Sequence, residues 1–126
     1  MALLETAIVA SDWLKQEAEN YRSRDTAIIA SGSGKLKSGQ VLGKLTASGK
    51  YVPNAATGSD GSQTAVAVLA FPVDATSSDA KAVVVAREAT ASHNGLTWGS
   101  TINDATKRAA AISQLKAVGI LVREGA

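Results

Sequence analysis

The segment AVAVLAFPVDATSSDAKAVVVARE, residues Ala65–Glu88, contains two apolar runs separated by a turn-rich stretch. The first run, Ala65–Phe71, is apolar on both faces of an extended chain, which predicts a buried central strand that ends at Pro72. The second run, Ala82–Glu88, predicts another buried strand that becomes polar at its end. We expect the polar residues between them, Asp74–Lys81, to form a loop, and we expect further loops over Ser31–Gly39 and Ala89–Ser100.

Shorter strands are expected on either side of this pair. Gly43 lies inside one of them and suggests a bulge or a close approach of another backbone segment. Gly49 suits a hairpin turn because glycine adopts positive φ without steric cost. The expected short strands are Thr26–Ala30, Gln40–Thr46, Tyr51–Pro53 and Ile120–Arg123.

One helix is expected near the C-terminus. Asn103 or Thr101 is the predicted cap, and Asp104 in the first turn suits the helix dipole. Gly119 has the position of a C′ residue that ends the helix. The predicted apolar face consists of Ala105, Ala109, Ile112, Leu115 and Val118.

The first 24 residues are harder to assign. Apolar residues at near-helical spacing (Leu4, Ile8, Leu14, Ala18 and Tyr21) permit an amphipathic helix, but the segment is equally consistent with an arm that orders on docking. We therefore divide the chain into an N-terminal arm or short helix (residues 1–24) and a β-rich domain (residues 25–126). The predicted fold class is α+β, mostly β: a small single domain of short strands with one C-terminal helix and an N-terminal arm.

The composition narrows the classes of function. The chain has 126 residues, 45% of them hydrophobic but only 4% aromatic, so small aliphatic side chains fill the core. A net charge of +2 from 13 basic and 11 acidic residues does not indicate nucleic acid or an anionic membrane as partner. The absence of cysteine excludes disulfides and thiolate metal sites. We expect no membrane span, since no apolar run approaches roughly 18 residues. We expect no signal peptide, since the N-terminus lacks a basic region and Glu5 interrupts its apolar run.

The sequence motifs that suggest phosphate binding, catalysis or calcium binding are incomplete. GSGK, residues Gly32–Lys35, lacks the upstream glycine and the following Ser or Thr of a phosphate-binding loop. His93 is the one histidine of the chain, and the adjacent Ser92 does not have the geometry of a catalytic pair. Asp60 and Asp74 lack the alternating oxygen ligands of a calcium loop, so we expect them to stabilise turns. We expect no catalytic residue, no metal and no cofactor.

Four stretches in order resemble the bacteriophage lambda-type head decoration proteins, which stabilise capsids. The stretches are RSRDTAII (Arg22–Ile29), SGQVLGKLTASGKYVP (Ser38–Pro53), DGSQTAVAVLAFPVDAT (Asp60–Thr76), and KAVVVAREA (Lys81–Ala89) with AISQLKAVGILVR (Ala111–Arg123). The resemblance covers about residues 22–123. The preceding 20 residues match the family pattern poorly.

The resemblance implies a structural role in the virion. Family members bind the outside of the expanded head as homotrimers at three-fold and quasi-three-fold positions, contact the major capsid protein and brace the shell against packaged DNA. Assembly in the host cytoplasm, without direct nucleic-acid or membrane contact, is implied as well. The family has no catalytic residues to carry over.

Candidate capsid-binding residues lie in and after the N-terminal segment. Trp13 is either a core residue or an interface anchor, since tryptophan is enriched among binding hot spots; Trp98 has the same two interpretations. The candidate capsid contacts are Trp13, Leu14, Tyr21, Arg22, Arg24 and Ile28. The alternative function is a small β-rich ligand-binding module for a sugar or peptide, and a hydrolase that uses His93 is a third hypothesis.

Overall fold

Strand β6 (Ala65–Leu69) is buried on both of its faces in the computed structural model, which describes residues 13–17 and 23–123. Ala67 and Leu69 belong to one hydrophobic cluster, whereas Ala65 and Val68 belong to a second. The prediction of a buried central strand is therefore confirmed. Each side of β6 faces a different core, so the two parts of the fold meet at this strand.

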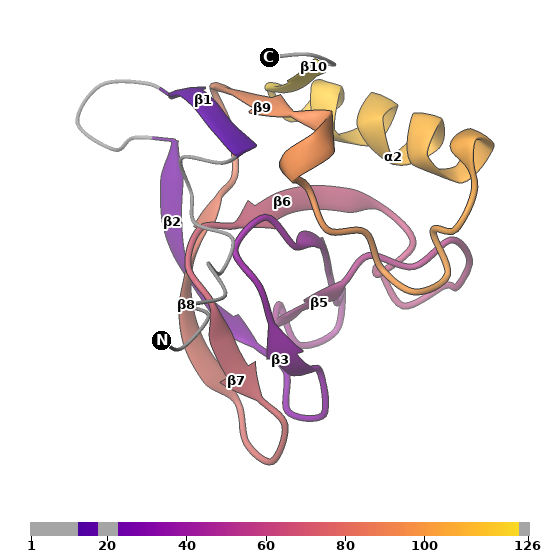
Figure 1. Cartoon of the computed structure of the whole chain (residues 1–126). Coiled ribbons are helices and arrows are strands. Elements are labelled where there is room, and N and C mark those ends of the chain that lie inside the picture. The colour runs from indigo at the N-terminus through magenta and orange to yellow at the C-terminus, as the bar shows by residue number, and fades with distance from the viewer. Residues whose placement is uncertain (1–12, 18–22, 124–126) are drawn as a thin grey trace, which may run out of the picture.

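Five strands form a closed barrel around the first of these clusters (Figure 1). Neighbouring strands pair antiparallel, except that β2 and β5 run parallel. Closure leaves no free edge in this sheet. In barrel order the strands are β2 (Arg24–Ile29), β5 (Tyr51–Pro53), β4 (Val41–Lys44), β6 and β8 (Ala80–Val85).

The barrel interior is filled by small and medium aliphatic side chains. A separate antiparallel pair, β3 (Gly34–Leu36) and β7 (Val73–Ala75), adds Leu36 and Ala75 to this cluster. Both strands lie in segments that the sequence predicted as loops, and those two predictions are wrong. The other buried members are Ala27, Ile29, Leu42, Ala67, Leu69, Ala82 and Val84.

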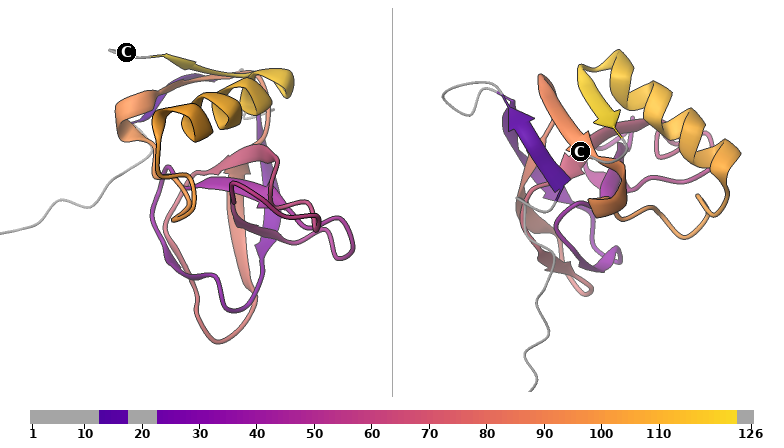
Figure 2. Two further views of the ribbon diagram at one scale, coloured as in Figure 1. Left: turned by 90° about the vertical axis from the view of Figure 1, so that its right-hand side faces the viewer. Right: turned by 45° about the horizontal axis from the view of Figure 1, so that its top comes forward.

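A second layer covers the other face of β6. Strand β9 (Ala89–Ser92) pairs antiparallel with β1 (Leu14–Glu17) and parallel with β10 (Ile120–Arg123). Helix α2 (Ala105–Ala117) packs against β10 and β6, and Figure 2 shows α2 and β10 side by side above the barrel. A single 3-10 turn, η2 (His93–Gly95), follows β9.

The start of the described chain differs from the sequence-based expectation. Leu14–Glu17 is a strand rather than part of an amphipathic helix, and it pairs with β9 within the folded domain. Ala89–Ser92, expected as a loop, is the central strand of this sheet. Leu4, Ile8, Ala18 and Tyr21 lie outside the described residues.

Helix α2 exists where the sequence predicted it, but its cap and its buried face differ. Asp104 is the N-cap, and its carboxylate accepts a hydrogen bond of 2.8 Å from the Lys107 backbone N–H. The predicted caps Asn103 and Thr101 lie outside the helix. The buried residues are Ala111 and Leu115, whereas Ala105 and Ala109 are exposed.

Three glycine predictions are confirmed. Position 43 carries a register irregularity, and a Cβ there would lie 2.6 Å from the Ser62 carbonyl oxygen. Gly49 has φ 73° in the turn between β4 and β5. Gly119, with φ 89°, directs the chain from α2 into β10 as its predicted C′ role requires.

The fold class is confirmed as mostly β with one longer helix near the C-terminus in a single small domain. No helix in the described part of the chain is long and apolar enough to cross a membrane.

Leu69→Ala tests the barrel core. Leu69 is fully buried, so its truncation should lower the free energy of unfolding by about 2–5 kcal/mol, measured by chemical denaturation. The matched control is Leu45→Ala, at a half-buried position outside both core clusters, which should cost clearly less. Equal losses for the two variants would contradict this account of the barrel core.

Candidate protein-interaction surface

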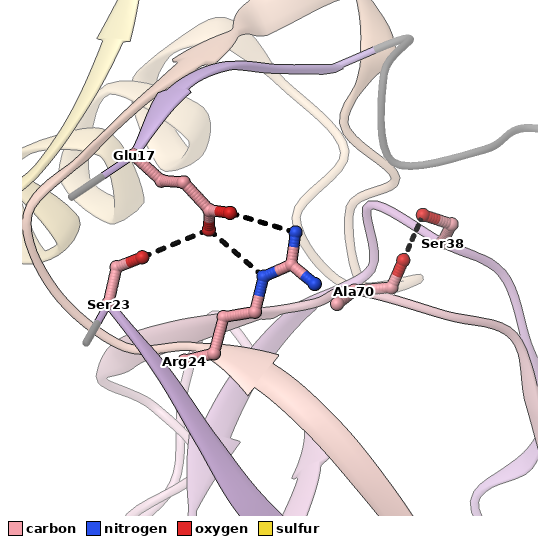
Figure 3. A network of polar contacts seen from close by, with 5 residues as sticks. All are labelled: Glu17, Ser23, Arg24, Ser38 and Ala70. Carbon is pink, nitrogen blue, oxygen red and sulfur yellow. Dashed lines mark hydrogen bonds and ion pairs between the residues drawn. The ribbon is translucent and has the colours of Figure 1, made fainter. Parts of the chain in front are cut away.

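The Trp13 side chain anchors the start of the described chain in the protein's own core. It is fully buried, and its indole N–H donates a hydrogen bond of 2.9 Å to the Ser38 hydroxyl. Ser38 in turn donates to the Ala70 carbonyl oxygen at 2.6 Å, a contact drawn in Figure 3. Trp13 is therefore not available as a surface contact in this conformation, and its core interpretation is the one that the structure supports.

A second anchor joins β1 to β2 through an ion pair. Arg24 binds both carboxylate oxygens of Glu17, with Nη2–Oε1 at 2.9 Å and Nε–Oε2 at 3.0 Å (Figure 3). The Ser23 hydroxyl donates to the same carboxylate at 3.0 Å. The two charged side chains are about four-fifths buried, at 21% and 17% exposure. Removal of either partner would break a mostly buried ion pair, which is costly.

The remaining candidate capsid contacts do not lie on one common strand. Leu14 is half-buried and packs against the core cluster that contains Trp13. Ile28 is half-buried on β2, where it alternates with the buried Ala27 and Ile29. Tyr21 and Arg22 lie outside the described residues.

Two exposed hydrophobic side chains were not among the contacts that the sequence predicted. Phe71 is 47% exposed and Leu121 is 38% exposed, and they are the exposed large hydrophobic side chains of the described chain. The Arg24 guanidinium lies over the Phe71 ring, 5.6 Å from its centroid. The sequence predicts Phe71 within a buried strand, but β6 ends at Leu69, so the prediction is wrong for Phe71.

The surface hollows are open to solvent. Three of them have volumes of about 390, 380 and 270 Å³ and are lined by mixed polar and aliphatic residues. Within residues 13–17 and 23–123, no three His, Cys, Asp or Glu side chains are grouped closely enough to hold a metal ion. The His93 ring lies against Trp98 with centroids 5.7 Å apart, and Ser92 is buried. Within the described residues, Phe71 and Leu121 are therefore the candidate points for contact with another protein.

The loop aspartates stabilise turns, as predicted. Asp60 accepts hydrogen bonds from the Ser62 hydroxyl and backbone, and Asp74 accepts the same pair from Thr76. These hydrogen bonds lower the pKa of both carboxyl groups, the hydroxyl contact being the largest cause. Asp79 pairs with Lys50 at 2.7 Å and accepts from the Ser31 backbone N–H at 2.8 Å, and both contacts lower its pKa.

The described chain thus combines a closed five-stranded barrel and a covering layer with two exposed large hydrophobic side chains. The family model described as bacteriophage lambda head decoration protein D matches residues 3–120. The chain belongs to this family, which confirms the resemblance seen in the sequence and implies a role in decorating the phage capsid. The comparison with curated proteins gave no match.

Asp79→Asn tests the turn carboxylate. Because folding lowers the pKa of Asp79 below the ordinary value of 3.8, its stabilising contribution is present above pH 3.8 and is lost as pH falls through the folded pKa. The wild-type unfolding midpoint should therefore fall more steeply on acidification than that of Asp79→Asn, measured by thermal denaturation across a pH series. Superimposable pH profiles would exclude a role for Asp79.

Trp13→Ala tests the anchor. Loss of this buried side chain should lower the free energy of unfolding by about 3–5 kcal/mol. Ser38→Ala removes the acceptor of the buried indole N–H and should cost about 1–3 kcal/mol. The control is Trp98→Ala, at a half-buried position, with a smaller loss. The free energies of unfolding are measured by chemical denaturation. Unchanged stability of Trp13→Ala would contradict the role of Trp13 as an anchor.

Proposed function

We propose that this protein binds the outer surface of the expanded phage head as a homotrimer, contacts the major capsid protein and stabilises the shell against the pressure of packaged DNA. The observation that carries the proposal is the family match over residues 3–120. The protein acts as a structural component of the virion, without turnover of a substrate. It is made in the host cytoplasm and binds at three-fold and quasi-three-fold positions of the finished shell.

The docking arm is the segment that precedes Trp13. Its sequence, MALLETAIVASD, is mostly apolar with two carboxylates, Glu5 and Asp12, so docking removes apolar surface from water. Trp13 attaches the arm to the core, which makes the tryptophan a structural anchor rather than a capsid contact. An arm that orders on binding costs about 2–5 kcal/mol, which the buried apolar surface offsets.

The small three-stranded sheet offers a second mode of contact. Among the described strands, β1 and β10 each pair with β9 alone, so each presents one edge that no described strand covers. A strand of the major capsid protein that adds to such an edge gains backbone hydrogen bonds without any particular side-chain chemistry. In this arrangement Leu14, Tyr21, Arg22, Arg24 and Ile28 form contacts around the docked arm.

Trimer formation strengthens docking by avidity. Once one arm of a trimer is bound, the other two are held close to their sites, and this effective concentration raises overall affinity without new contacts. Modest individual contacts then suffice for stable decoration of the shell.

The deciding experiment is cosedimentation with mature, decoration-free heads, followed by cryo-electron microscopy. We expect density at the three-fold positions of expanded heads, and weakened binding after deletion of residues 1–12. That deletion spares Trp13, so the unfolding midpoint should stay unchanged. The control is the full-length chain with Ala109→Asp, an exposed change on α2, which should bind normally. Failure of the full-length protein to bind any expanded head of its own phage would refute the proposed function.

A further inference from the structure

The Phe71 side chain lies in a mostly apolar hollow on the protein surface. The hollow has a volume of about 270 Å³ and is lined by residues of β2, β7, β8 and the link from β6 to β7. Phe71 is 47% exposed, and a large exposed apolar side chain set in a hollow is typical of a contact site. We call this surface the Phe71 hollow. Its lining includes Thr26, Phe71, Pro72, Val73, Lys81 and Val83.

A series of hydrogen bonds connects the start of the described chain to this hollow. The Trp13 indole N–H donates to the Ser38 hydroxyl, which donates to the Ala70 carbonyl oxygen. The Ala70 backbone N–H donates in turn to the Val83 carbonyl oxygen at 2.9 Å, and Val83 lines the hollow. Residues 1–12 are therefore attached to the described chain close to the Phe71 hollow.

The sequence of residues 1–12 contains an apolar run that suits such a hollow. Ala7–Ala10 reads AIVA, and the carboxylates of Glu5 and Asp12 flank it on its two sides. The run lies three to six residues before Trp13, so even a fully extended chain carries it no farther than about 22 Å from that residue. The apolar run is therefore within reach of the Phe71 hollow.

The charges around the hollow favour the same placement. Lys81 is exposed and is the charged residue among those that line the hollow, so the rim of the hollow is basic. The Arg24 guanidinium, which binds Glu17, lies 5.6 Å from the centroid of the Phe71 ring. An apolar run with a carboxylate on either side is complementary to an apolar hollow with a basic rim.

We propose that Ala7–Ala10 packs into the Phe71 hollow of its own chain before the protein meets a head, and that docking on the capsid draws this segment out of the hollow. The second step rests on the proposed function, whereas the contact itself is a property of the unbound protein. Packing of Ile8 and Val9 against Phe71 removes apolar surface from water. The contact therefore keeps the docking arm away from other apolar surfaces until a capsid site competes for it.

A spin label on the full-length chain tests the contact in the absence of heads. The sequence has no cysteine, so Thr6→Cys supplies one attachment point just before the apolar run. In nuclear magnetic resonance spectra, we expect the label to broaden the amide signals of Phe71, Val73 and Val83. The amide signal of Ala109, which lies on α2 and does not line the hollow, should stay sharp.

Substitutions in the segment and in the hollow supply the controls. Ile8→Asp combined with Val9→Asp should abolish the broadening, and so should Phe71→Ser. Leu121→Ser changes the other exposed large hydrophobic side chain of the described chain and should leave the broadening intact. Circular dichroism verifies that each variant is folded. Equal broadening when the spin label and the isotope label are on different chains would assign the contact to a neighbouring copy and overturn the inference.

Binding to expanded heads tests the release step. A segment held in the hollow lowers the fraction of protein that can dock, so Phe71→Ser should bind expanded heads roughly three- to tenfold more tightly than the wild type. Ala109→Asp should bind as the wild type does. Weaker or unchanged binding of Phe71→Ser would overturn the release step.

The outcomes separate this inference from the proposed function. Absence of broadening in the spin-labelled chain without further changes would overturn the contact, and wild-type protein that still binds expanded heads would leave the decoration role standing. A chain that shows the broadening but binds no expanded head would refute the proposed function and the release step, whereas the contact in the unbound protein would stand.

Discussion

The burial of β6 on both faces is the constraint on which the rest of the structure depends. With 4% aromatic residues, the chain fills its cores with Ala, Val, Leu and Ile, and such side chains need close packing from two sides. One side of β6 faces the interior of the closed barrel, and the other faces the layer of β1, β9, β10 and α2. Because a single strand serves both cores, the barrel and its covering layer are packed together through β6.

The sequence predicted what short-range patterning determines and missed what distant partners determine. The apolar runs at β6 and β8, the turn at Gly49 and the helix stop at Gly119 follow from local chemistry. The missed strands β1, β3, β7 and β9 are short and rich in small or polar residues, and they become strands through partners elsewhere in the chain. The face of α2 was misplaced because alanine at positions 105 and 109–111 gives the helix no distinct apolar stripe.

The exposure of surface residues likewise depends on distant partners that the local sequence does not indicate. Trp13 was a candidate contact because it lies in a weakly patterned segment, but its burial depends on Ser38, 25 positions away, which no local pattern indicates. Phe71 and Leu121 were missed because each ends or lies within an apolar run, where burial is the natural expectation. Their exposure follows from the end of β6 at Leu69 and from the position of β10 at the margin of its sheet.

Two groups of polar contacts fix the start of the described chain to the rest of the fold. The Trp13–Ser38–Ala70 hydrogen bonds hold the start of the described chain against the end of β6, and the Glu17–Arg24 pair holds β1 against β2. Trp13 is therefore held at a fixed point close to Phe71, the residue that follows Ala70. Arg24 contacts both Glu17 and Phe71, so the ion pair that joins β1 to β2 and the exposed Phe71 ring share one group of side chains. In the proposed trimer, a fixed Trp13 in each copy would set where the three docking segments begin, which is the geometry that avidity requires.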